Sequence, residues 1–201
     1  MRSPVILLSV LVITTAAWTA ASTVSMSPEQ SVLTVRVFKS GLFSAFGHEH
    51  EVSAPIQKGS FTEQSPAVEL SVDARRLRVM DQDVSDKDRA EIQQTMLGPK
   101  VLDSERFPEI RFHSTSIEAA GDGKWVVRGE LTLHGETRPI KFEVARQNGH
   151  YRGSAELRQK DFGIAPVTVA GGTVKVKNEL RVEFDIVGDG KPGLASAPNQ
   201  R

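Results

Sequence analysis

The chain has 201 residues and a formal net charge of zero, with 25 Lys and Arg against 25 Asp and Glu. This length favours one domain, and the basic residues form no cluster that would follow a phosphate backbone, which excludes nucleic acid as a partner. Cysteine is absent, so disulfides and thiolate metal sites are excluded.

The first 21 residues have the features of a secretory signal peptide. Arg2 is the only charge before Glu29, residues 5–17 form an apolar run, and small residues precede a cleavage point near Ala21. The alternative is an uncleaved membrane anchor, but the run is shorter than the roughly 20 residues that span a bilayer. We therefore expect a signal peptide over residues 1–21 and a secreted or periplasmic protein.

Segments of alternating apolar and polar residues predict a series of strands. In chain order they are residues 31–40, 50–62 with a break near Pro55, 67–73, 109–117, 124–133, 139–145, 151–157 and 173–187. Glycine-containing turn signals lie between several of them. Residues 188–201 are rich in Gly, Pro and Ala, and we expect a flexible tail there.

Residues 85–97 predict the single helix. Ser85 can cap its start, Asp86 and Asp88 suit the first turn, and Gly98-Pro99 ends it. Ile92 and Met96 lie four residues apart on one face, so we expect the helix to cover an opening or a flank of the fold.

The last strand is long enough to restrict the architecture. Fifteen residues at about 3.3 Å each would reach roughly 50 Å, so this strand must coil or bulge. About eight such strands with one helical insertion predict an all-β fold, an antiparallel eight-stranded barrel over residues 22–187. A two-sheet sandwich is the structural alternative.

Four segments resemble the YceI-like family of lipocalin-like proteins associated with polyisoprenoid binding. They are FPEIRF at 107–112, GELTLHGETRPI at 129–140, KDFGI at 160–164, and the alternating C-terminal strand. Their order and spacing cover about residues 30–187. Residues 41–50 look like one particular branch of the family.

The resemblance implies a lipocalin-like barrel that holds a long amphiphilic lipid in its lumen, such as an isoprenoid quinone, a polyprenyl chain or a fatty-acid amide. It implies no catalytic machinery and no required cofactor beyond a bound isoprenoid or fatty-acyl lipid. The compatible partners are this lipid, a membrane surface in transient contact, and a second copy in a homodimer.

The apolar parity of the strands supplies the candidate lining residues. These are Val35, Val37, Phe43, Phe46, Val68, Leu70, Val72, Ile110, Phe112, Leu131, Phe142, Val144, Val176, Leu180 and Phe184. A filled core would have the same pattern, because a half-buried strand looks alike in both cases. Phe43 and Phe46 lie between two glycines, which fits either a mobile mouth or a tight corner. Asn178 on the apolar parity marks a bulge or supplies a polar headgroup contact.

His48 and His50 share one face if this stretch is extended, and could bind Zn²⁺ or Cu²⁺. A further ligand would have to come from Glu51, His113 or His134. The alternative is a pair of rim histidines, which could also hydrogen-bond a headgroup. A metal-binding protein or metal-dependent enzyme centred on this pair is therefore the second functional hypothesis.

No arrangement for nucleophilic catalysis is present in the sequence, which has neither a Gly-x-Ser-x-Gly motif nor a thiol. The carboxylate pairs Asp81/Asp83 and Asp86/Asp88 lie in a polar loop and at a helix start. We expect solvated or capping roles for them, and we expect no enzyme activity.

Overall fold

The computed structural model describes residues 23–40, 49–62, 67–169 and 174–188. Its first strands are β1 (Thr23–Ser25), β2 (Val32–Ser40), β3 (His50–Ser53), β4 (Ile56–Thr62), β5 (Ala67–Asp73) and β6 (Arg78–Val79). After helix α1 (Asp86–Leu97) come β7 (Glu109–Ala119), β8 (Lys124–Leu133), β9 (Glu136–Gln147), β10 (His150–Arg158), β11 (Thr168–Val169) and β12 (Val174–Val187). Two 3-10 turns, η2 (Ala74–Arg76) and η3 (Gln159–Phe162), complete the described elements.

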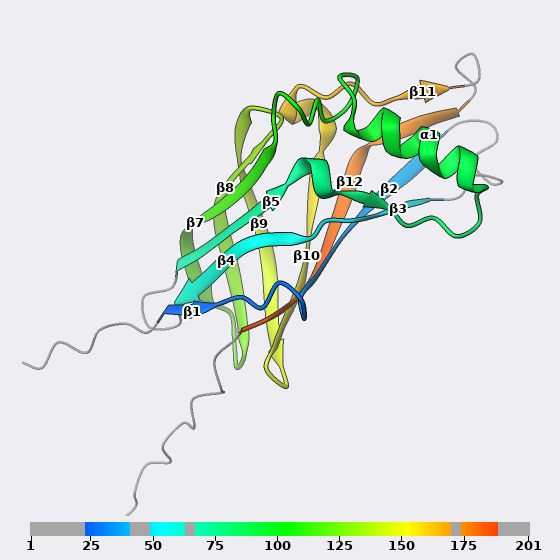
Figure 1. Cartoon of the computed structure of the whole chain (residues 1–201). Coiled ribbons are helices and arrows are strands. Elements are labelled where there is room, and N and C mark those ends of the chain that lie inside the picture. The colour runs from blue at the N-terminus through cyan, green and yellow to red at the C-terminus, as the bar shows by residue number, and fades with distance from the viewer. Residues whose placement is uncertain (1–22, 41–48, 63–66, 170–173, 189–201) are drawn as a thin grey trace, which may run out of the picture.

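The strands form one strongly curled antiparallel sheet (Figure 1) in the order β1-β4-β5-β7-β8-β9-β10-β12-β2-β3-β6. β4 lies next to one end of this order and β3 lies next to the other. Only Ala54 and Pro55 separate these two strands in the chain, so β3 and β4 act as halves of one bent strand that joins the two ends of the sheet. At this bend, the Ala54 amide donates to the Leu33 carbonyl at 2.9 Å. The predicted barrel-type, all-β architecture is confirmed.

The strand count differs from the eight predicted. The described residues form a 12-stranded sheet, in which β1, β6 and β11 are short additions. With these left out, and with β3 and β4 taken as one bent strand, the eight long strands remain. The predicted break near Pro55 is the reason that this strand counts twice.

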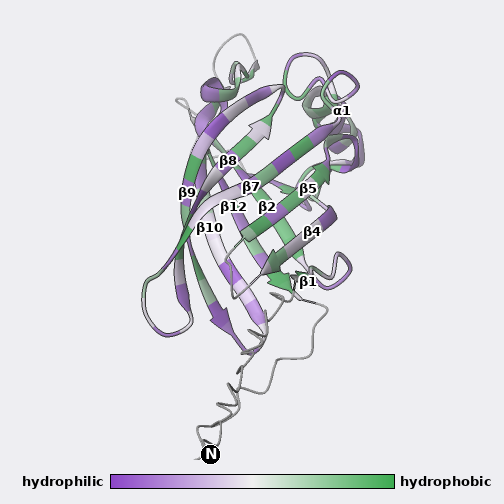
Figure 2. Ribbon diagram, turned by 90° about the vertical axis from the view of Figure 1, so that its left-hand side faces the viewer, coloured by the Kyte–Doolittle hydropathy of each residue, from purple (hydrophilic) through white to green (hydrophobic). Residues whose placement is uncertain are grey.

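The alternation in sequence becomes an inner and an outer face of the sheet, visible as alternating bands in Figure 2. On β12, Val182 and Ile186 lie on the inner face, while Arg181 and Glu183 form ion pairs with Glu156 and Arg36 outside. The predicted irregularity of β12 is also present, because its register with β2 shifts between Val176 and Leu180.

Asn178 lies in this bulge, as predicted, and its Oδ1 accepts from the Lys160 amide at 3.0 Å. The buried Gln159 side chain donates to the Lys177 carbonyl at 2.7 Å. The turn η3 thus satisfies the backbone groups that the bulge releases from the ladder.

Helix α1 begins and ends as predicted. Ser85 caps it by accepting from the Asp88 amide at 3.1 Å, and the helix ends before Gly98. It lies across one end of the curled sheet, and β1 lies at the opposite end (Figure 1). None of the helices in the described residues is long and apolar enough to cross a membrane.

Candidate functional site

Two apolar cavities lie inside the curled sheet, one toward each end. Cavity 1, of about 350 Å³, lies on the side of β1. Its wall comes from residues of eight strands, namely β2, β4, β5, β7, β8, β9, β10 and β12, and from Met26 after β1. These residues are Met26, Leu33, Phe61, Thr62, Val68, Leu70, Phe112, Ile117, Trp125, Val127, Phe142, Val144, Arg146, Tyr151, Phe184 and Ile186.

Aromatic rings form much of this wall. The ring of Phe142 lies 5.4 Å from that of Phe112 and 5.5 Å from that of Phe184, in tilted and edge-on arrangements. Gly129 permits this packing, because a Cβ there would stand 2.5 Å from the Phe112 ring. Tyr151 and Trp125 continue the aromatic surface, with ring centroids 6.1 Å apart.

Cavity 2, of about 400 Å³, lies beneath α1 at the other end. Most of its wall is aliphatic, with a few polar groups: Val35, Val37, Lys39, His50, Val52, Leu77, Val79, Asp88, Glu91, Ile92, Thr95, Met96, Val101, Leu102, Leu133, Gln159, Ile164, Val167, Val176 and Leu180. Ile92 and Met96 come from the helix, so the predicted role of α1 as a cover is confirmed.

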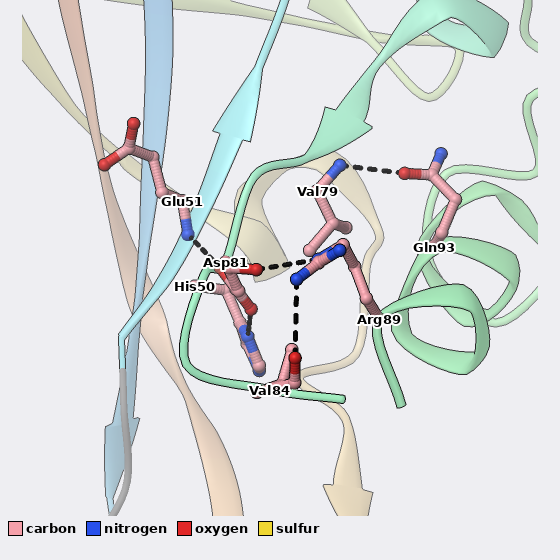
Figure 3. A network of polar contacts seen from close by, with 7 residues as sticks. All are labelled: His50, Glu51, Val79, Asp81, Val84, Arg89 and Gln93. Carbon is pink, nitrogen blue, oxygen red and sulfur yellow. Dashed lines mark hydrogen bonds and ion pairs between the residues drawn. The ribbon is translucent and has the colours of Figure 1, made fainter. Parts of the chain in front are cut away.

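The side chain of Gln93 attaches α1 to the short edge strand β6. Its Oε1 accepts from the Val79 amide at 2.8 Å (Figure 3), and its Nε2 donates to the Leu77 carbonyl at 2.8 Å. The Gln93 side chain thereby bonds the backbone groups of Leu77 and Val79 in the way that a neighbouring strand would. Arg89 adds bonds from its Nε to the Asp81 carbonyl at 2.7 Å and from Nη2 to the Val84 carbonyl at 3.3 Å.

A packed layer, here called the waist, separates the two cavities. On β12, Phe184 lines cavity 1 and Leu180 lines cavity 2, with Val182 between them. On β8, Leu131 lies in the same way between Val127 and Leu133. The waist residues belong to one hydrophobic cluster, and none of them lines either cavity. They are Val72, Ile110, Leu131, Ile140, Leu157 and Val182.

The structure sorts the predicted lining residues into groups. Six line cavity 1, namely Val68, Leu70, Phe112, Phe142, Val144 and Phe184, and four line cavity 2, namely Val35, Val37, Val176 and Leu180. Val72, Ile110 and Leu131 belong to the waist and line neither cavity. Phe43 and Phe46 lie outside the described residues.

Sequence reasoning did not name several wall residues. Leu33 and Ile186 lie on the predicted apolar parities and could have been found by extending them. Ile117 lies on the opposite parity to Ile110 and Phe112, and the register shift between Ser114 and Ser116 precedes it. Trp125 and Tyr151 lie near strand starts, where aromatic residues beside a turn are a weaker signal.

His50 brings a polar group to the wall of cavity 2. It shares the inner face of β3 with Val52 and pairs in register with Val37. Its Nδ1 lies 2.5 Å from Oδ2 of Asp81, whose side chain is only 2 % exposed. The other carboxylate oxygen of Asp81 accepts from the Glu51 amide at 2.8 Å (Figure 3).

The expectation of a solvated or capping role is wrong for Asp81, because Asp81 lies on the buried parity of Leu77 and Val79. At the helix start the expectation is confirmed. Asp88 receives the Ser85 hydroxyl at 2.8 Å, and Asp86 pairs with Arg89 at 2.9 Å.

The proposed metal ligands do not gather around His50 within the described residues. Glu51 pairs with Arg36 at 3.3 Å, His113 with Glu130 at 3.3 Å, and His134 with the Phe162 carbonyl at 3.1 Å. No group of three His, Cys, Asp or Glu in this part of the chain could hold a metal ion. His48 lies outside the described residues, so the His48/His50 pair stays a prediction.

The outer wall carries its own charged network. Burial raises the pKa of Asp185, but bonds from Arg152 at 2.8 Å and His150 at 2.6 Å outweigh it and hold this pKa below its usual value. Hydrogen bonding and charge from Glu183 raise the pKa of Arg36. These pairs belong to the outer face of the sheet, and none of their residues lines either cavity.

Residues 19–188 match the YceI-like domain. The chain belongs to the YceI-like family. The match covers the whole described barrel, including both cavities and the helix. The resemblance of the four sequence segments is therefore confirmed.

Similar proteins extend this YceI-like assignment. A UPF0312 protein of Vibrio cholerae is 31% identical over 127 residues, which is 58% of this chain and 61% of that protein. A UPF0312 protein of Shewanella denitrificans is 32% identical over 108 residues, 49% of this chain and 56% of that one. These matches thus span about three fifths of the relatives' length.

A solved structure shows the same fold. The crystal structure of Burkholderia cenocepacia BcnA has a TM-score of 0.55 and 17% sequence identity, covering 80% of this chain and 98% of that one. At this level of identity the likeness concerns the fold alone.

Proposed function

We propose that this protein is a secreted or periplasmic carrier that binds a long amphiphilic lipid in its barrel, without turnover chemistry. The observation that carries the proposal is the pair of apolar cavities, of about 350 and 400 Å³. Both fall in the range of about 300–1,000 Å³ that small-molecule sites occupy. The association of YceI-like proteins with polyisoprenoids supports an isoprenoid or fatty-acyl chain as the guest.

The energetics suit pick-up and delivery. Each buried methylene is worth about 0.8 kcal/mol relative to water, so a five-carbon isoprene unit contributes roughly 4 kcal/mol before ordering costs. The competing environment is a membrane, which hides the chain equally well. Transfer between bilayer and barrel is therefore near balance.

The waist limits the length of chain that fits without rearrangement. Each cavity is at the small end of the usual range, and the waist residues close the way from one to the other. A guest of moderate length fits within one cavity, and a longer chain requires the waist to open.

Trp125 offers a direct test, because the chain has two tryptophans and the other, Trp18, lies in the expected signal peptide. In protein lacking residues 1–21, farnesol should shift the fluorescence of Trp125 as it enters cavity 1. Val144→Phe, which places a larger side chain in the wall of this cavity, should weaken the shift. Ala145→Phe, on the opposite face of β9, should preserve it. No shift up to the solubility limit of farnesol would contradict the proposal for this cavity.

A further inference from the structure

We infer that His50, oriented by Asp81, is the headgroup site of cavity 2, and that it selects amphiphiles whose headgroup donates a hydrogen bond. The class comprises long-chain alcohols and primary amides, in contrast to esters, ethers, quinones and ionised fatty acids, which only accept. This inference rests on the proposed binding of a lipid and names the chemistry that recognises it.

The first step is the position of the ring. His50 lies on the inner face of β3 with Val52, and it lines the same cavity as Val37, its partner across the ladder. Its side chain is 14% exposed. It is thus a largely buried polar group in a mostly aliphatic wall, where the burial of a polar group is costly unless it is hydrogen-bonded.

The second step is the assignment of the ring proton. Asp81 accepts from the Glu51 amide through Oδ1 and lies 2.5 Å from His50 Nδ1 through Oδ2. A carboxylate can only accept, so Nδ1 carries the proton in the neutral ring. The lone pair of that ring is then on Nε2, which has no hydrogen-bond partner among the described residues. A carboxylate that orients a histidine in this way also fixes its tautomer.

The third step is the chemistry of the guest. An acceptor at Nε2 pairs with a headgroup that brings its own O–H or N–H. A headgroup with acceptors alone would face the Nε2 lone pair, leaving both groups desolvated and unpaired. The apolar residues in the wall of cavity 2, such as Val35 and Met96, would hold the hydrocarbon chain of the guest.

The test compares tetradecan-1-ol with its methyl ether, which keeps the chain and the oxygen but lacks the donor. Binding to protein expressed from the full chain is followed by the Nε2 resonance of His50, with the histidine rings labelled with ¹⁵N. His50→Phe assigns this resonance by removing it. We expect the alcohol to bind about tenfold more tightly than the ether and to shift the Nε2 resonance.

Asp81→Asn provides the variant that separates this role from a structural one. The Asn carbonyl still accepts from Glu51, but its amide now donates to Nδ1, so the ring proton moves to Nε2. The preference for the alcohol should then disappear, because both probes accept. Asp185→Asn is the matched control: it alters the His150–Asp185 pair on the outer wall, with Nδ1 and Oδ1 2.6 Å apart, and should leave the preference unchanged.

The outcomes are separable. Equal binding of alcohol and ether to the wild type, or an unchanged preference in a folded Asp81→Asn protein, would overturn the headgroup site and leave lipid binding intact. Failure of both probes and of farnesol to bind the wild type would overturn the proposed function, and this inference with it.

Discussion

Leu33 and Val35 lie two residues apart on the same face of β2, and they line different cavities. The waist passes between them. Across the ladder Val35 pairs with Val182, a waist residue, and Leu33 pairs with Phe184 of cavity 1. Two neighbouring inward positions of one strand thus belong to two different cavities.

Shortening a waist residue should join the two cavities. Leu131→Ala should lower the free energy of unfolding by about 2–5 kcal/mol, because Leu131 is buried in the packed layer. It should also raise the affinity for geranylgeraniol relative to farnesol by about tenfold, since a longer chain can pass the waist. Urea unfolding and titration with both prenols measure these effects.

Leu77→Ala is the control for this change. Leu77 is equally apolar and buried, but it lines cavity 2 at the end of η2 and is not a waist residue. It should lose similar stability without any gain for the longer prenol. An equal gain in both variants would mean that the waist does not set chain length.

The strands and the helix could be predicted from the sequence because their signals are local. Alternation located β5 and β8 at the observed bounds, and Ser85 with Gly98 located α1. Parity identifies the inner face of a strand, but it does not determine whether the enclosed space is filled. The waist depends on side chains that come from six strands, so no local pattern could predict it.

Asp81 is a different case, because a signal was present in the sequence. Leu77, Val79 and Asp81 alternate with Arg78 and Met80, and this places Asp81 on the buried parity. The polar residues around it favoured a solvated loop instead. An Asp or Glu that follows apolar residues at alternating positions can therefore be predicted to be buried and to accept a hydrogen bond from a buried donor.

The attachment of α1 by Gln93 gives a second prediction. Gln93→Met keeps the volume but removes both bonds to β6, leaving the Val79 amide and the Leu77 carbonyl unsatisfied, at a cost of about 1–3 kcal/mol. Amide hydrogen exchange in α1 should accelerate, and tetradecan-1-ol should leave cavity 2 faster. Gln94→Met, on the exposed face of the same helix, should change neither rate.

The stability of the protein toward acid should depend on Asp73. Arg75 donates to both oxygens of Asp73 at 2.8 Å, and this hydrogen bonding lowers the pKa of the carboxyl. A lowered folded-state pKa contributes stability that is present above about pH 4 and is lost as the pH falls through the folded value.

Asp73→Asn should therefore lower the free energy of unfolding at neutral pH by about 0.2–1 kcal/mol. The difference from wild type should vanish once the pH has fallen below the folded-state pKa of Asp73, where both side chains are neutral. Urea unfolding across this range measures it. A difference that grows as the pH falls would have the wrong sign for this pair.

Export through the expected signal peptide should shorten the chain at its N-terminus. Protein expressed in a Gram-negative host from the full chain should be recovered from the periplasm with residues 1–21 removed, so that its intact mass corresponds to a start near Ser22. Recovery of the intact chain in the membrane fraction would instead indicate the uncleaved anchor.

The content of the cavities after export is the most direct test of the carrier. Protein recovered without detergent is extracted with organic solvent, and the extract is analysed by mass spectrometry. The comparison is the folded double variant Val37→Phe/Val144→Phe, which narrows both cavities. The account predicts a long-chain amphiphile in near-stoichiometric amount from the wild type and a strong loss from the double variant. An extract of the wild type without lipid, or equal lipid from both proteins, would contradict it.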